Sequence, residues 1–85
     1  MARHVFVKGK QYEVKWKDHF SDSAWKSPSE IEEWVKENQD PCTTRGTVVY
    51  QTDEILVMSA SDDGGGNYGD LMAIYKNHIV KKRRL

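Results

Sequence analysis

The most apolar stretch of the chain, Gly46 to Ala60, has the pattern of an antiparallel β-hairpin. Two runs of β-branched and aliphatic residues, Thr47 to Tyr50 and Ile55 to Met58, flank a polar turn at residues 51–54. A separate strand is predicted over Gln11 to Lys17, where every second side chain is apolar. Both stretches are therefore expected to lie in a sheet that buries one face.

A short helix is predicted between the first strand and the hairpin. Ser27 and Glu30 have the spacing of a capping box, and Pro28 suits the first helical position because it has no N–H to satisfy. Pro41 prevents continuation, so the helix is expected to run for about ten residues. Apolar side chains recur along it with helical spacing, at Ile31, Trp34 and Val35. We expect this stripe to pack against the sheet.

The rest of the chain is predicted to consist of strands joined by short connections. The hairpin strands and two later ones cover Thr43–Gln51, Glu54–Ser61, Leu71–Tyr75 and a short final strand from Ile79. With the first strand these make five strands and one inserted helix, the element order of a small SH3-like β-barrel whose last strand pairs with its first. Residues 10–85 are interpreted as a single SH3-like domain, and residues 1–9 as an N-terminal extension or edge strand.

The composition is that of a folded domain in a reducing compartment. Hydrophobic residues make up 38% of the 85 residues, too many for a disordered chain. A single cysteine, Cys42, excludes an internal disulfide. The chain starts without the apolar segment of a secretory signal, and no apolar run is long enough to span a membrane. We therefore expect a cytoplasmic protein without a membrane partner.

Charge is segregated along the chain although the formal net charge is zero. Residues 1–17 sum to +4, residues 18–40 to −5, residues 41–75 to −4 and residues 76–85 to +5. If the first and last strands pair, the two basic ends share one face. Such a face is either a solvated surface or a nucleic-acid site, in which phosphates would contact Lys15, Lys17, Lys81, Lys82, Arg83 and Arg84.

Partial matches to nucleotide-binding and metal-binding motifs lack the neighbouring residues that these motifs require. The segment Gly64 to Gly69 matches G-x-G-x-x-G, but no helix and no acidic residue about 20 positions later follow it. A calcium loop beginning at Asp62 would need glycine and glutamate where Asn67 and Ala73 stand. The soft metal ligands lack the close spacings of zinc sites; they are His4, His19, His78 and Cys42. We expect neither an enzyme nor a bound cofactor or metal.

The predicted loop from Asp18 to Ser27 is polar except for two aromatic residues, Phe20 and Trp25. Aromatic side chains in a loop are either interface anchors or contacts that hold the loop on the domain, and both interpretations stay open. The acidic helix residues that follow would meet either a basic partner or water; they are Glu32, Glu33 and Glu37.

Several segments resemble, in their order and spacing, small uncharacterised proteins of tailed bacteriophages and prophages. These segments are Val14–Asp18, Ser21–Glu30, Gly46–Tyr50, Leu56–Ser61 and Met72–Val80. The resemblance covers roughly residues 10–85 and implies a phage-encoded protein in the bacterial host cytoplasm, with no established activity to carry over.

Small phage proteins of this size often act by binding a host or phage protein, which agrees with the lack of catalytic motifs. The leading hypothesis is therefore a non-enzymatic protein-binding module that uses Phe20, Trp25, Glu32, Glu33 and Glu37. Nucleic-acid binding by the basic ends is the alternative. The sequence leaves the oligomeric state open.

Overall fold

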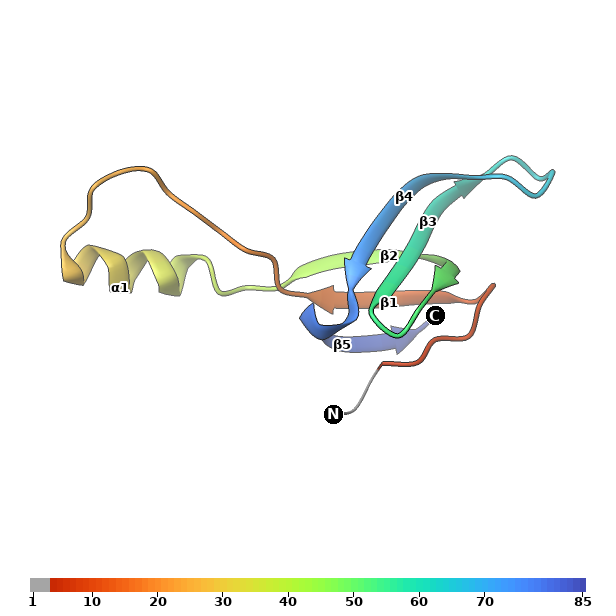
Figure 1. Cartoon of the computed structure of the whole chain (residues 1–85), viewed down its shortest axis with the longest axis horizontal. Helices are drawn as coiled ribbons and strands as arrows, with labels where there is room; N and C mark the ends of the chain where they lie inside the picture. Colours follow the sequence, from red (N-terminus) through yellow and green to blue (C-terminus); the bar gives the residue numbers. More distant parts are fainter. Residues whose placement is uncertain (1–3) are drawn as a thin grey trace.

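The computed structural model describes residues 4 to 85, which form a mainly β structure with a single α-helix (Figure 1). The elements are β1 (Gln11–Trp16), α1 (Pro28–Glu37), β2 (Cys42–Gln51), β3 (Ile55–Asp62), β4 (Tyr68–Tyr75), the 3₁₀ turn η1 (Lys76–His78) and β5 (Ile79–Arg84). The five predicted strands, the helix and their order along the chain are confirmed.

All five strands belong to one antiparallel sheet in the order β4-β3-β2-β1-β5. The last strand pairs with the first, as predicted, with Glu13 opposite Arg83 and Lys15 opposite Lys81. Strands β4 and β5 are the two edges, and within residues 4–85 they do not pair with each other. The sheet is therefore not closed into a barrel.

Strand β2 belongs to both halves of this sheet. Its first half pairs with β1 and its second half with β3, and the two ladders meet at Thr47. Figure 1 shows the hairpin of β3 and β4 crossing β1 and β5 at a steep angle. Next to the meeting point, a Cβ added at Gly46 would lie 2.6 Å from the backbone oxygen of Ser59. Only glycine lets the two backbones pass this closely.

The core fills the space between the crossing halves. Its members are the inward side chains of all five strands and one residue before β1: Phe6, Tyr12, Val14, Val48, Leu56, Met58, Ile74 and Ile79. The alternation predicted for β1 is confirmed, because Tyr12 and Val14 are buried and Trp16 packs against the cluster. The inner face of the sheet is thus buried mainly by side chains of its own strands.

The segment before β1 forms no strand over residues 4–9, but it contributes to the core. Phe6 is buried and meets the ring of Tyr12 edge to face at 4.9 Å. The side-chain amide of Gln51 fixes its backbone, since Nε2 donates to the Phe6 carbonyl at 2.6 Å. The imidazole Nε2 of His4 lies 3.1 Å from the carbonyl of Ile79.

Strand β4 begins three residues earlier than predicted. Tyr68 already lies opposite Asp62 in the ladder, so the predicted flexible loop from Gly64 to Gly69 loses its last residues to the sheet. A buried hydroxyl stabilises this extension, because Ser59 Oγ lies 2.7 Å from the carbonyl of Gly69.

The helix α1 does not pack against the sheet, and the expectation that it would was wrong. None of its ten residues is buried. Together with its flanking loops it forms the arm, defined as residues 17–41, which stands off the end of the sheet and lies along the longest, 53 Å dimension of the molecule (Figure 1). The hairpin is consequently not buried against Ile31 or Trp34.

Replacing Gly46 by Ala is expected to lower the free energy of unfolding by about 1–3 kcal/mol, because the new Cβ meets backbone atoms that a side chain cannot move. Gly69→Ala is the matched control, since nothing lies within 4 Å of its added Cβ and its φ is not in the left-handed region. It should leave stability unchanged or raise it by up to about 1 kcal/mol. Urea unfolding of the three proteins makes the comparison, and equal values for the two variants would contradict the close passage.

Candidate functional site

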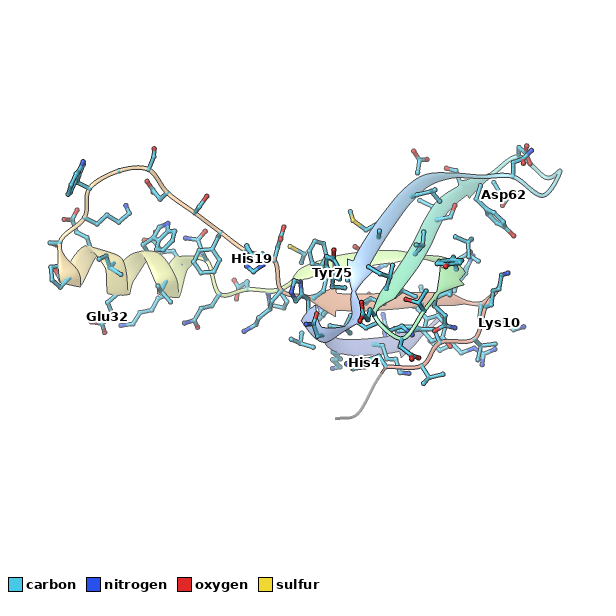
Figure 2. The ribbon with its side chains drawn as sticks, in the orientation of Figure 1. His4, Lys10, His19, Glu32, Asp62 and Tyr75 are labelled. Carbon is cyan, nitrogen blue, oxygen red and sulfur yellow. The ribbon has the colours of Figure 1, made fainter. Side chains whose placement is uncertain are left out.

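The arm leaves and re-enters the sheet at one place, because Trp16 at the end of β1 lies opposite Cys42 at the start of β2. Aromatic rings surround this base of the arm. The ring of His78 meets that of His19 at 5.4 Å and that of Tyr75 at 5.7 Å, both edge to face. Figure 2 shows His19 and Tyr75 at the junction of arm and sheet. These contacts fix the point from which the arm projects.

The start of the helix is held by the predicted capping box. The N–H of Glu30 donates to Ser27 Oγ at 3.3 Å, and the N–H of Ser27 donates to Glu30 Oε1 at 3.0 Å. The hydrogen bond from the Ser27 N–H holds the pKa of Glu30 below its ordinary value. The arm therefore has local order of its own without support from the sheet.

The apolar side chains of the arm gather on one side of it. Phe20 meets Trp34 edge to face at 4.9 Å, so this loop aromatic packs on the helix and not on the sheet. Trp25 is 100% exposed, and Ile31 is 47% exposed. A shallow groove between loop and helix is lined by Trp25, Ile31 and Trp34. The structure thus leaves a tryptophan and an isoleucine in water on a projecting element.

Acidic side chains lie on other parts of the arm, and Figure 2 shows Glu32 on the side of the helix away from the loop that carries Trp25. Glu32, Glu33 and Glu37 are all exposed, and Glu32 forms an ion pair with Lys36 at 3.4 Å (Figure 2). Asp22 forms another with Lys26 at 3.3 Å. Its pKa lies below the ordinary value because the N–H of Ala24 and the ammonium of Lys26 both donate to it. Even with these lysines, residues 18–40 keep a formal charge of −5.

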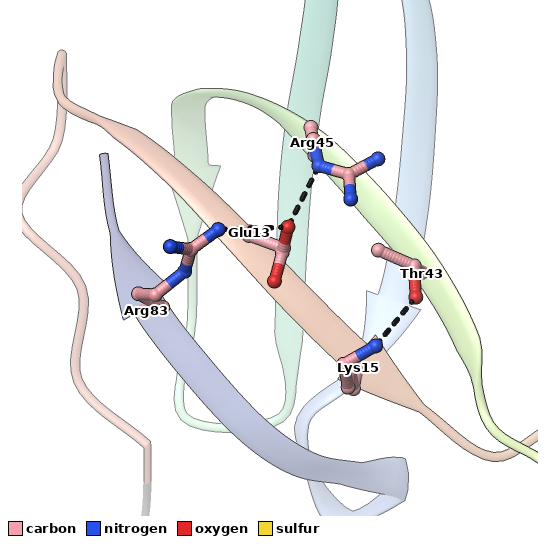
Figure 3. Close-up of polar contacts among 5 residues, drawn as sticks. All are labelled: Glu13, Lys15, Thr43, Arg45 and Arg83. Carbon is pink, nitrogen blue, oxygen red and sulfur yellow. Dashed lines mark hydrogen bonds and ion pairs between the residues drawn. The ribbon is translucent and has the colours of Figure 1, made fainter.

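A second charged surface lies on the sheet face opposite to the core. We define the basic face as Lys15, Arg45, Lys81 and Arg83, which lie on the same side of the sheet as Glu13. Figure 3 shows Arg45 and Arg83 on either side of the Glu13 carboxylate, with the Lys15 ammonium directed toward Thr43. Arg45 Nε and Arg83 Nη2 lie 2.7 and 3.1 Å from Glu13 Oε2. The hydrogen bond from Arg45 is the main cause of a lowered pKa at Glu13, and the hydrogen bond from Arg83 lowers this pKa further. The Glu13 side chain is only 11% exposed.

Three of the six residues predicted for the nucleic-acid site do not lie on the basic face. Lys82 and Arg84 alternate to the other side, opposite Val14 and Tyr12. The ammonium of Lys82 lies 4.8 Å from the ring centre of Phe6, and it donates to the Val5 carbonyl. Lys17 follows β1 and belongs to the arm. The two-residue period of β5 thus places Lys82 and Arg84 on the other side of the strand from Lys81 and Arg83.

Arg45 was not among the residues predicted from sequence. The alternation of β2 placed Arg45 on one of its two faces, but only the register shows that it lies opposite Glu13. The exposure of Ile31 was also missed, since its helical spacing looks the same whether the stripe faces a core or water.

Neither a cluster of metal ligands nor a membrane-spanning helix is present in the described residues. Residues 4–85 contain no group of three His, Cys, Asp or Glu side chains placed to hold a metal ion. In the predicted glycine loop, the carboxylate of Asp63 accepts hydrogen bonds from the backbone N–H groups of Gly65 and Asn67 and from the side-chain amide of Asn67. No helix over the same residues has the length and apolarity to cross a membrane.

Comparison with known proteins adds no relative: no protein family, no curated protein and no solved structure matches the chain.

Replacing Glu13 by Gln is expected to flatten the acid limb of the stability curve. Because its folded-state pKa is lowered, the carboxylate stabilises the fold above the ordinary glutamate value of about 4.3, and this contribution is lost as pH falls through the lower folded value. The effect should be small, since both arginines are more than half exposed.

Urea unfolding between neutral and strongly acidic pH measures this difference between wild type and variant. Glu33→Gln is the matched control, because within residues 4–85 its carboxylate has no ion pair. Parallel curves for wild type and Glu13→Gln would show that the ion pairs contribute nothing.

Proposed function

We propose that this chain is a non-enzymatic protein-binding module with an SH3-like arrangement of strands, whose arm contacts the partner. The SH3-like interpretation is supported by the helix inserted between β1 and β2, by the pairing of β5 with β1, and by the 3₁₀ turn Lys76–His78 before the last strand. As the resemblance to small phage proteins implies, the proposed partner is a host or phage protein in the bacterial cytoplasm.

The observation that carries the proposal is the full exposure of Trp25 beside Ile31 and Trp34. A tryptophan that packs on nothing contributes no burial to the fold, and it leaves a large apolar surface in water. Tryptophan is also the side chain most enriched among residues that dominate binding energy. The projecting position of the arm lets a partner reach this groove without meeting the sheet (Figure 1).

Charge narrows the chemistry of the partner. The arm has a formal charge of −4, and its ion pairs with Lys26 and Lys36 stay within the arm. A complementary surface would offer an apolar pocket for Trp25 bordered by lysine or arginine. Such a partner should bind faster and more tightly at low ionic strength.

Trp25→Ala is expected to abolish capture of a partner from bacterial lysate and to leave the melting temperature unchanged, because the indole contacts no core residue. Once the captured protein is purified, calorimetric titration should show a loss of at least about 2 kcal/mol of binding energy for this variant.

Tyr68→Ala is the matched control, since Tyr68 is an exposed aromatic at the far end of the sheet. Equal weakening by both variants, or binding that does not change with salt, would refute the arm as the contact surface. A large fall in melting temperature for Trp25→Ala would show that this residue supports the fold.

A second candidate, nucleic-acid binding by the basic face, is favoured by one observation. Lys15 and Lys81 lie directly opposite each other on β1 and β5, and like charges at such positions destabilise a sheet. With Arg45 and Arg83 they leave the face with a net charge of +3 after Glu13 is counted (four cations, one carboxylate). A phosphate backbone would relieve this repulsion.

Gel-shift titration with single- and double-stranded DNA and RNA at low salt tests this candidate. Lys81→Glu should weaken binding, whereas Lys8→Glu makes the same charge change in the exposed segment before β1, away from the four defined residues. Absence of binding by the wild type removes the candidate, and equal losses for both variants would indicate unspecific attraction.

A further inference from the structure

The edge strand β4 presents a row of apolar side chains that no other strand covers. Leu71 and Tyr75 are 60% and 58% exposed, and Ala73 between them is exposed as well. These side chains lie on the face of the sheet opposite to the core residues Leu56 and Ile74. Sheets usually protect such an edge with lysine, proline or a bulge, and residues 71–75 contain none of these.

The hydrogen-bonding groups at this edge follow from the ladder between β3 and β4. The N–H of Lys76 donates to the carbonyl of Glu54 at 2.8 Å, which makes this a hydrogen-bonded pair. Hydrogen-bonded and non-hydrogen-bonded pairs alternate in an antiparallel ladder, so Ala73, opposite Val57, is at a non-hydrogen-bonded position. Residues 71 and 75 share its parity. The N–H and C=O groups of these three residues therefore point away from β3, toward a side where no strand of residues 4–85 lies.

We propose that β4 pairs with β4 of a second copy of this chain about a two-fold axis through Ala73. In this antiparallel register Leu71 lies opposite Tyr75 of the partner subunit, and Ala73 lies opposite its own counterpart. Every outward N–H and C=O of residues 71, 73 and 75 then has a partner. The aliphatic and aromatic side chains meet as cross-strand pairs on a surface that continues across the axis.

Two features favour a second copy over an unrelated strand. The register is self-complementary, because residues 71, 73 and 75 of one copy lie opposite residues 75, 73 and 71 of the other. A formal net charge of zero also means that two copies do not repel each other overall. The left-handed φ of 52° at Asp70 and the 3₁₀ turn at Lys76 limit the regular edge to residues 71–75. Only this register pairs all three outward residues of both copies.

Sedimentation equilibrium of the full chain over a range of about micromolar to millimolar concentration tests the proposal. The mass should rise from 9.8 kDa toward twice that value with concentration. Ala73→Lys places two ammonium groups on strands whose Cα atoms are about 5.5 Å apart at the axis, and it should remain monomeric throughout. Val80→Lys adds the same charge at an exposed position of β5 and should dimerise like the wild type. Melting at low concentration confirms that each variant is folded.

Amide hydrogen exchange identifies the mode of association without any substitution. The amides of residues 71, 73 and 75 should become protected as concentration rises, whereas those of Met72 and Ile74, which face β3, are protected at every concentration. A chain that stays monomeric at millimolar concentration overturns the proposal, as does a dimer that leaves the outward amides unprotected. A dimer lost in Trp25→Ala but kept in Ala73→Lys would instead form through the arm; the edge proposal can thus fail while the proposed function stands.

Discussion

The close passage of the β2 and β3 backbones at Gly46 determines how the rest of the sheet is arranged. Strand β2 pairs with β1 over one half and with β3 over the other, and its ladder with β3 shifts register between Val48 and Tyr50, so the two halves of the sheet cross each other (Figure 1). The inward side chains of both halves, such as Val14 and Leu56, then bury one another. A flat sheet of the same strands would leave these side chains in water, and 85 residues offer no second layer to cover them.

This arrangement also explains why the helix stands apart. The inner face is filled by strand residues and by Phe6 from the N-terminal segment, so it has no vacant surface for the stripe of α1. A ten-residue helix in isolation is marginal in water. Here it has a capping box, a proline at its start and the contact of Phe20 with Trp34 to compensate. The arm is therefore expected to open locally well before the sheet unfolds.

The elements of this fold could be predicted from sequence because their signals are local. Alternation in β1, the capping box at Ser27 and the hairpin signals depend on neighbouring residues, and each was found at or close to its observed bounds. The packing of α1, the division of the basic residues and the role of Arg45 depend on contacts between distant segments. A helical stripe such as Ile31 and Trp34 looks alike whether it faces a core or solvent, so only the structure reveals that Ile31 is exposed and that Trp34 packs on Phe20 instead of the sheet.

The pairing of Trp16 with Cys42 has a consequence for how such a chain can change. Since the arm begins and ends at adjacent positions of one ladder, its sequence can be exchanged without moving any strand. The entropic cost of closing a loop grows only with the logarithm of its length, so a shorter or longer insertion would alter the cost of folding very little. The sheet can in this sense carry different insertions at the same position. The partner contacts proposed for the arm could therefore change while the core residues stay the same.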